Sequence, residues 1–236
     1  HLHSFMKNIL PFITGALIAG SVPGFAGDFA VTEKKGEAIT VTYDGKAVVH
    51  LVTRNDRSTK EAAHETYKVF LHVNDPLDPT RTITKGAGDK FTHHRGIYIG
   101  WSRAKIGGQG YDTWHMKGAM RQEFDRLVDW KADDRSATFT AAINWVDGNL
   151  VLMTERRTFT VHRPGDNGAF LLDQTSKITA VSGDAELNGD PEHAGCQFRA
   201  TAEVVKNKSA KYVFPAGAMD QKTVTAARNL PWAAMT

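Results

Sequence analysis

The chain has 236 residues, 23% of them charged, and a formal net charge of +3 at pH 7. This length and composition are typical of a globular protein with one domain and a sizeable core. The basic residues do not gather into a patch or a stripe, so the charge pattern predicts no nucleic-acid partner.

The first 26 residues have the pattern of a targeting segment. A short basic start at Met6-Lys7 is followed by a mostly apolar run and by Gly24-Phe25-Ala26, which resembles a small-x-small cleavage site. The apolar run is short and interrupted, which makes it a poor spanning helix, although an uncleaved anchor is the alternative. We predict cleavage after Ala26, a periplasmic or extracellular protein without membrane attachment after cleavage, and one domain over residues 27–236. Residues 1–5 precede the natural-looking start and are interpreted as an upstream or vector remnant.

Cys196 is the one cysteine of the chain. An exported protein with a single cysteine forms no intrachain disulfide, so its stability must come from its core. The residue lies in an apolar alternation, and we expect its side chain to be buried and unreactive.

Strand patterns follow one another along nearly all of the chain after residue 37. Turn sequences such as Asp44-Gly45 and Asp147-Gly148 separate them and favour tight hairpins. Residues 54–64 are polar and are expected to form a loop, and no segment of useful length has helical periodicity. Hairpins without crossover helices indicate an all-β fold, an antiparallel β-sandwich. The expected strands before and after the central motif are Glu37–Tyr43, Ala47–Thr53, Tyr67–Val73, Met120–Trp130, Ser136–Trp145, Leu150–Val161 and Phe170–Ala180.

The stretch Thr92–Trp101 contains the densest group of chemically active side chains, among them His93, His94 and Arg95. If the stretch is a strand, Arg95 and Trp101 share one face, and the two histidines point to opposite faces. Paired histidines and an arginine beside indole rings suit a small polar ligand. The alternative is a strand end with solvated histidines and with tryptophans that only pack.

A glycine-rich segment after this motif is short enough to bring Asp112, Trp114 and His115 back beside it. Asp112 would then orient a histidine by accepting its ring N–H. His193 lies one turn before another expected strand, a position from which its side chain would reach the same open face. These residues are therefore expected to line one pocket.

Two further pairs of polar side chains lie on expected strands, with the two members of each pair on one face. Glu155 and Arg157 fall on the apolar face of their strand, where charges are costly unless they are paired or placed at a site. We expect them either at the floor of the pocket or as a structural ion pair. Near the end of the chain, Gln197 and Arg199 share one face of the expected strand that follows His193.

Several of these blocks together resemble the bacterial PmoA family, whose members carry the name methane oxygenase. The His-His-Arg-Gly sequence at residues 93–96 is the most specific mark, and the resemblance extends from about residue 37 to the end of the chain. The blocks that carry it are Thr92–Trp101, Asp112–Gly118, Glu155-x-Arg157, His193–Arg199 and Leu230–Met235.

The family name does not describe a function for this chain. The membrane subunit of that name spans the bilayer several times, whereas residues 27–236 contain no apolar stretch long enough to span it. The resemblance implies instead an exported β-sandwich protein, similar to the large sandwiches of sugar mutarotases, whose relatives accompany sugar oxidoreductases and carbohydrate-degrading proteins. Family members continue with more strands, so the resemblance also implies truncation at the C-terminus.

These observations favour an exported carbohydrate-related enzyme that acts on a sugar or keto-sugar by histidine acid–base chemistry, as a lyase, hydrolase or epimerase. No Gly-x-Ser-x-Gly motif indicates a serine hydrolase. A non-catalytic sugar-binding module is the alternative. A divalent metal held by the histidines, which an oxygenase would need, is less favoured because neighbouring strand histidines point apart, so no cofactor is predicted.

The expected ligand is a small sugar or an oligosaccharide, and its contacts divide into two groups. The expected catalytic residues are His93, His94, Arg95, His115 and His193. The expected substrate-binding residues are Trp101, Asp112, Trp114, Glu155, Arg157, Gln197 and Arg199.

Overall fold

The computed structural model describes residues 28–166, 168–190, 192–207, 211–215, 217–218 and 230–235. The expected targeting segment, residues 1–26, lies outside the described residues. Within the described part of the chain, no helix is both long enough and apolar enough to cross a membrane.

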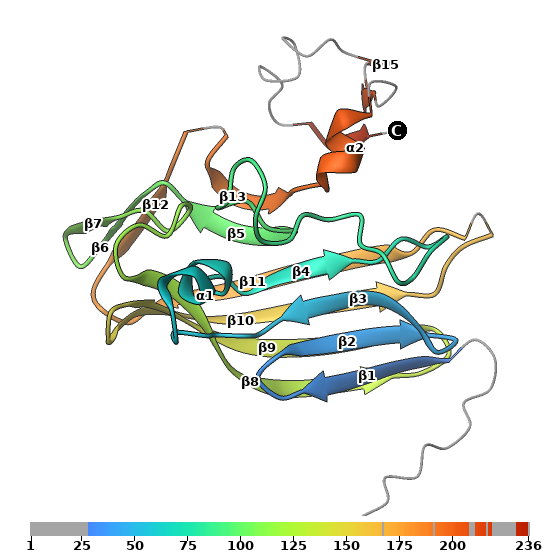
Figure 1. Ribbon diagram of the computed structural model, residues 1–236, viewed down its shortest axis with the longest axis horizontal. Helices are drawn as coiled ribbons and strands as arrows, with labels where there is room; N and C mark the ends of the chain where they lie inside the picture. Colours follow the sequence, from blue (N-terminus) through green and yellow to red (C-terminus); the bar gives the residue numbers. More distant parts are fainter. Residues whose placement is uncertain are drawn as a thin grey trace, which may run out of the picture.

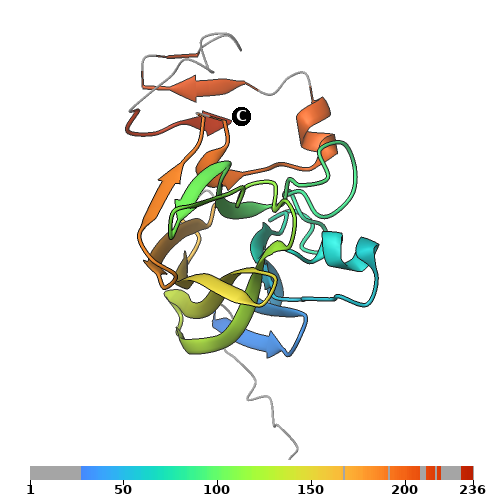
Figure 2. The same cartoon turned by 90° about the vertical axis from the view of Figure 1, so that its left-hand side faces the viewer.

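Two antiparallel sheets form the body of the molecule as stacked layers (Figures 1 and 2). Strand β1 packs across the layers on β8 and β9, which closes one side of the sandwich. The expected all-β antiparallel sandwich is therefore confirmed. The six-stranded sheet has the order β1 (Phe29–Lys34), β2 (Ala38–Tyr43), β3 (Lys46–Val52), β4 (Phe70–Val73), β5 (Ile97–Trp101) and β13 (Ala194–Phe198). The four-stranded sheet has the order β11 (Leu171–Ala180), β10 (Leu150–His162), β9 (Ser136–Asp147) and β8 (Met120–Ala132).

Smaller elements lie at the ends of this sandwich. One three-stranded sheet has the order β12 (Ala185–Asn188), β6 (Arg103–Ile106) and β7 (Gln109–Tyr111). A second has the order β15 (Gly217–Ala218), β14 (Tyr212–Phe214) and β16 (Ala234–Met235). Two short helices, α1 (Lys60–Glu65) and α2 (Ala202–Lys206), complete the described elements.

The main core lies between the two large sheets, where strand alternation directs apolar side chains inward. In β9 the alternate residues Ala137, Phe139, Ala141, Ile143 and Trp145 are all almost fully buried, as the sequence predicted. The hairpin turn at Asp44-Gly45 is also confirmed, since both residues have positive φ angles, as a primed two-residue turn requires.

A second, smaller core lies on the other face of the six-stranded sheet. Phe70, Tyr98 and Trp114 form it, with Val52 packed beside them. In β5, Tyr98 points to this outer core, whereas Ile99 belongs to the main core. The outer core is the platform on which the histidine motifs lie.

Three expectations about local structure were wrong, two about the backbone and one about the exposure of Cys196. Residues 60–65 form helix α1, because the Thr59 hydroxyl accepts a hydrogen bond from the Ala62 N–H and caps the helix start. The strand of the histidine motif begins only at Ile97, so strand alternation does not govern the residues before it.

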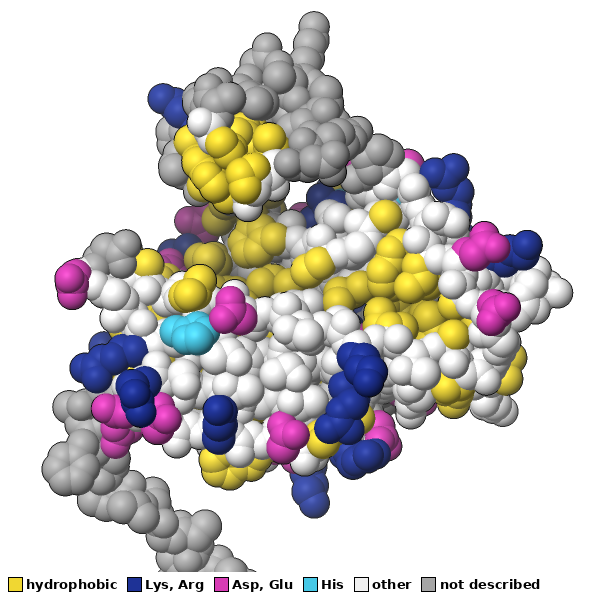
Figure 3. All heavy atoms as spheres, turned by 180° about the vertical axis from the view of Figure 1, so that it is seen from behind, with side chains coloured by type: hydrophobic (Ala, Val, Ile, Leu, Met, Phe, Trp, Pro, Cys, Tyr) yellow, Lys and Arg dark blue, Asp and Glu magenta, His cyan; other side chains and the backbone are white. Residues whose placement is uncertain are grey.

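Cys196 is exposed, not buried. It pairs with Ile99 across β13 and β5, which places its side chain on the inner face of the sheet. The thiol lies beside Gln174 of β11, the edge strand of the four-stranded sheet. Figure 3 shows hydrophobic side chains in the recess at this side of the molecule.

Candidate functional site

Four histidines from three separate parts of the chain form one continuous series of ring contacts. The ring centroids are 4.4 Å apart for His93 and His94, 4.6 Å for His93 and His115, and 5.4 Å for His115 and His193. We call this series the histidine ladder. The structure thus brings together the three histidine motifs that the sequence singled out.

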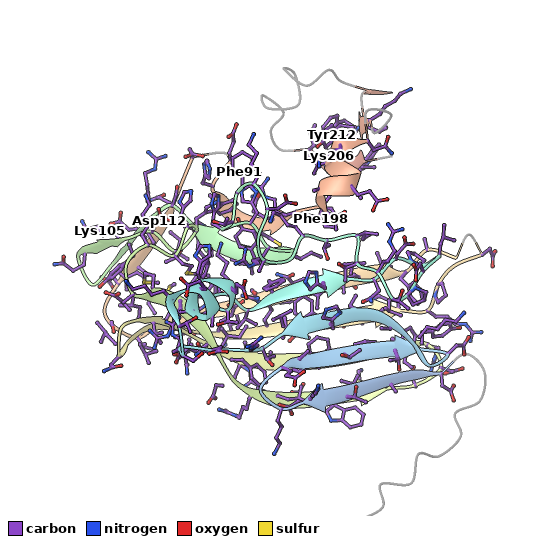
Figure 4. All side chains as sticks on the ribbon, in the orientation of Figure 1. Phe91, Lys105, Asp112, Phe198, Lys206 and Tyr212 are labelled. Atoms are coloured by element: carbon purple, nitrogen blue, oxygen red, sulfur yellow. The ribbon has the colours of Figure 1, made fainter. Side chains whose placement is uncertain are left out.

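An aromatic ring closes each end of the histidine ladder. Phe91 lies 5.2 Å from His94, with the two rings tilted by 30°. Trp114 lies 5.4 Å from His193 and is fully buried, whereas Phe91 is about half exposed. Figure 4 shows Phe91 and Asp112 beside the edge formed by β5 and β13. The exposed aromatic surface of the site is therefore that of Phe91, a residue that the sequence analysis missed.

The loop before β5 places both histidines of the His-His pair in the ladder. Phe91 has a φ angle of 58°, and its carbonyl accepts a hydrogen bond from the His94 N–H at 2.9 Å. This turn breaks the extended geometry on which the expected opposite orientation of His93 and His94 depended. A bulky residue with positive φ is strained, and such strain is concentrated at functional sites.

The buried side chain of Arg95 fixes the conformation of this loop through hydrogen bonds. Its side chain is fully buried, and its guanidinium donates hydrogen bonds to the backbone carbonyls of Thr92, His94 and His64. The geometry makes Arg95 a positioning residue for the loop, in place of the direct contact with the ligand that the sequence predicted.

Two glycines allow the close backbone packing that the site needs. A Cβ atom added to Gly96 would lie 2.2 Å from the Leu71 carbonyl oxygen, and one added to Gly100 would lie 2.6 Å from the Thr113 carbonyl oxygen. The segment that carries Trp114 and His115 therefore lies directly against β5. This contact brings the second histidine motif beside the first.

Asp112 orients a histidine, as the sequence predicted, and the structure identifies that histidine as His115. The Nδ1 atom of His115 lies 2.8 Å from Asp112 Oδ2, and the same carboxylate accepts hydrogen bonds from the backbone N–H groups of Trp114 and His115. These bonds and the Lys117 ammonium at 3.1 Å keep the pKa of Asp112 below its usual value, although burial acts in the opposite direction. The Nε2 atom of His115 is left available for proton exchange.

Asp190 forms a second Asp–His pair with His193. The His193 Nδ1 atom lies 2.6 Å from Asp190 Oδ1, and the hydrogen bond lowers the pKa of the aspartate. The sequence analysis missed Asp190. The signal was present in the spacing, because Asp112-x-x-His115 and Asp190-x-x-His193 have the same interval. The two pairs face each other through their histidine rings.

Lys68 is a second residue that the sequence analysis missed. It is fully buried, and its Nζ atom donates hydrogen bonds to the carbonyls of His93 at 2.7 Å and Trp114 at 2.5 Å. The ammonium also lies 4.0 Å from the centre of the Tyr98 ring, a cation–π contact. Burial lowers the pKa of Lys68 well below its usual value. Lys68 thus links the segment that carries His93 to the segment that carries Trp114 and His115.

His93 and His94 are neutral near pH 7. Burial lowers the pKa of His93 to about 4, and the charges of nearby His115, Lys68 and Arg199 act in the same direction. Burial lowers the pKa of His94 to about 3, with Arg199 as the next largest cause. Neutral imidazoles accept as well as donate hydrogen bonds, which suits binding of hydroxyl groups.

A family model described as a family of unknown function, DUF6807, matches residues 38–236. The chain belongs to this family. No curated protein and no solved structure gives a significant match. The matched region includes the whole histidine ladder and both aspartates that orient it, so the site is part of the DUF6807 region. The family description assigns no activity.

Arg199 and Gln197 lie on the ladder side of the sheet. Gln197 pairs with Tyr98 across β13 and β5, so these side chains share the outer face. The Arg199 guanidinium lies 5.5 Å from the centre of the Trp114 ring. The Gln197 amide donates a hydrogen bond to the Ala194 carbonyl at 3.2 Å. The Arg199 guanidinium lies beside the Tyr98 hydroxyl and is the better placed of the two side chains to bind a ligand.

Three of the expected substrate-binding residues lie elsewhere. The Trp101 ring packs 5.9 Å from Trp145 against the main core, because Trp101 has the opposite strand parity to Tyr98. Glu155 and Arg157 form a fully buried ion pair at 2.7 Å. Their remaining bonds go to Trp145, Ser176 and the Val69 carbonyl, so the pair is structural and is not the floor of the site.

The histidine ladder is a partly open surface site. A cavity of about 510 Å³ lies between β11 and β12, lined among others by Met153, Ile178 and Leu187, and a second of about 220 Å³ lies beside Tyr43. The histidines line neither of these two cavities, and the expected closeness of the three histidine motifs is seen in their ring contacts. No group of three or more histidine, cysteine, aspartate or glutamate side chains in the described residues has the geometry of a metal site.

Proposed function

We propose that the protein is an exported enzyme of carbohydrate metabolism that moves a proton on a sugar or keto-sugar by histidine acid–base catalysis. One observation carries the proposal: two Asp–His pairs face each other with their imidazole rings 5.4 Å apart. Paired acid and base groups at this spacing suit proton transfer next to a carbonyl group.

The proposed chemistry uses the free Nε2 atoms of His115 and His193. One neutral imidazole removes the proton from the carbon next to the carbonyl, and the other, protonated, gives its proton to the carbonyl oxygen, which yields an enol. Each aspartate fixes the tautomer of its histidine and stabilises the imidazolium that forms. Return of the abstracted proton through water to the other face of the carbon, while the enol hydroxyl gives its proton back to the second imidazole, gives an epimer. Loss of a leaving group from the enol gives a lyase product.

The side chains around the two Asp–His pairs are suited to hold a ligand in position. His93 and His94, both neutral, offer hydrogen bonds to sugar hydroxyls. The exposed ring of Phe91 offers an apolar surface for the C–H face of a sugar. Trp114 is buried and supports the ring of His193 from behind.

A non-catalytic sugar-binding module is the second candidate. The half-exposed Phe91 beside His94 favours it, because an exposed aromatic ring can pack on the C–H face of a sugar without any catalytic group. Both candidates need the same ligand contacts, and only the enzyme needs the two Asp–His pairs.

Export is proposed from the sequence of residues 6–26. N-terminal sequencing of the protein recovered from the periplasm or the medium should give Gly27 as its first residue. Recovery of the chain in a membrane fraction with Met6 still present would contradict this proposal.

Proton exchange separates the two candidates. The protein is incubated in D2O with a panel of aldoses and keto-sugars, and deuterium uptake next to the carbonyl is followed by proton NMR. We expect uptake that His115→Gln and His193→Gln abolish and that His162→Gln leaves unchanged. His162 is the matched control because it also pairs with an aspartate, Asp173 at 2.8 Å, but on β10 and β11. Ligand binding without exchange would establish the binding module instead.

A further inference from the structure

Basic side chains gather around the histidine ladder, and carboxylates act on three of them only at longer range, Asp112 on Lys68, Asp89 on Lys85 and Glu65 on Arg95. Lys68, Lys85 and Arg199 act on the charge state of His94, and Arg95 acts in turn on Lys68 and Lys85. Among the described residues, none of the four has a carboxylate within ion-pair distance. The two aspartates of the site are already engaged, Asp112 with His115 and Lys117 and Asp190 with His193.

Two of these cations are deep in the protein. Lys68 is 1% exposed and Arg95 is 0% exposed, and backbone carbonyls accept their hydrogen bonds. Carbonyl oxygens satisfy the N–H groups but do not neutralise the charge. Lys68 answers this cost through its lowered pKa, whereas the Arg95 guanidinium stays charged. A buried charge without a bonded counter-charge is costly, which favours binding of an anion nearby.

Buried donors without partners lie in the same layer. The Nε1 atom of Trp114 and the Nε atoms of Arg95 and Arg199 are buried and have no hydrogen-bond partner. Trp114 contacts both His193 and Arg199 through its ring, so the indole and the guanidinium belong to one site. Buried donors are almost always satisfied in proteins, and a ligand that supplies acceptor oxygens would satisfy these.

Arg199 differs from the other cations in how readily a ligand could reach its charged group. Lys68 and Lys85 direct their ammonium groups to backbone carbonyls, and Arg95 donates to two carbonyls of its own loop and to that of His64 in α1. Arg199 has the Tyr98 hydroxyl beside it and is only partly buried. A single planar guanidinium matches the two oxygens of a carboxylate.

We propose that the ligand of the histidine ladder carries a carboxylate, as a sugar acid does, and that Arg199 binds this carboxylate. The inference rests on the proposed function only for the sugar part of the ligand. A neutral sugar would leave the excess of cations without a counter-charge, whereas a carboxylate offsets it and supplies acceptors for the unpaired donors. Arg199 would then determine the specificity for acidic over neutral sugars.

Titration calorimetry of the full-length protein tests this directly. The probes are D-glucuronate, D-glucose and D-glucose 6-phosphate, each measured with the unaltered protein and with Arg199→Gln, Arg199→Lys and Arg126→Gln. We expect glucuronate to bind about tenfold more tightly than glucose. Arg199→Gln should remove this preference, Arg199→Lys should keep part of it, and the control Arg126→Gln, at an exposed pair with Asp125, should keep all of it.

Each other outcome overturns the inference in a defined way. Equal binding of glucose and glucuronate, no binding of glucuronate, or a preference that survives in Arg199→Gln removes Arg199 as a carboxylate receptor. Preferred binding of glucose 6-phosphate that depends on Arg199 would assign the site to phosphate. Thermal melts of the variants exclude unfolding as the cause. Deuterium exchange reports on the proposed catalysis separately, so glucuronate binding without exchange would overturn the enzyme and leave this inference standing.

Discussion

The rings of His115 and His193 lie 5.4 Å apart, although the two residues come from distant parts of the chain. Each ring is held through its Nδ1 atom by an aspartate three residues earlier. This arrangement leaves two Nε2 atoms on one surface. The first prediction concerns these pairs.

Replacement of Asp190 by asparagine should lower kcat about 100-fold, because the neutral amide no longer fixes the tautomer of His193 or stabilises its protonated form. KM should change little, since Asp190 serves the ring and not the ligand. Steady-state kinetics on the substrate found by deuterium exchange measures both constants. Asp173→Asn, which alters the separate pair with His162, should have no effect on either, and equal losses in the two variants would contradict the assigned role.

The chain at the start of β5 lies so close to β4 that position 96 requires a glycine. In Gly96→Ala the new methyl group would lie 2.2 Å from the Leu71 carbonyl oxygen, so the strands must separate. We expect the free energy of unfolding to fall by about 3 kcal/mol, as for severe overpacking. Urea denaturation followed by circular dichroism gives this value. Gly110→Ala, where an added Cβ meets nothing within 4 Å, should be close to neutral, and similar losses in both would rule out the steric cause.

Stability should fall as the pH is lowered from neutrality. The pKa of His93 is about 4 and that of His94 about 3 in the folded protein, against 6.5 for an unperturbed histidine. Between these values the unfolded chain binds protons that the folded chain does not, so acid favours unfolding, and the full stability is present above the unfolded pKa. Urea titrations at pH 7 and pH 5 measure the difference.

A double variant, His93→Gln with His94→Gln, isolates this effect from that of other groups. Its stability should depend less steeply on pH, with about two fewer protons taken up on unfolding at most. His162→Gln, which removes a partly exposed histidine outside the ladder, is the matched control. An unchanged slope in the double variant would mean that the two histidines titrate normally in the folded state.

The buried pair of Glu155 and Arg157 should be structural. Glu155→Ala leaves the Arg157 guanidinium buried without its counter-charge, and we expect a loss of about 3–5 kcal/mol in the free energy of unfolding. Asp125→Asn, at an exposed pair with Arg126, should change it by less than about 0.5 kcal/mol. Ligand binding well below the melting temperature should survive in Glu155→Ala, and a specific loss of binding would return the pair to the site.

The fold class followed from local patterns that need no tertiary information. In β9 every second residue from Ala137 to Trp145 is apolar, and alternation of this kind predicts a half-buried strand whatever its neighbours. Asp44-Gly45 predicted its hairpin for the same reason, since the turn depends on the φ preferences of its own two residues. Helix α1 was missed because its signal is a single capping threonine.

The sequence by itself determined the antiparallel β-sandwich, the identity of the histidine motifs and a role for Asp112 in orienting a histidine, all of which depend on residues close together in the chain. Only the tertiary structure decided that Asp190 orients His193, that Lys68 lies beneath, and that Trp101 faces the main core while Trp114 faces the site. It also decided that Cys196 is exposed, because exposure depends on what covers the inner face at the edge of the sheet. Spacing and alternation describe one strand at a time, whereas a site is formed by strands that hydrogen bonds and close packing at Gly96 and Gly100 bring together.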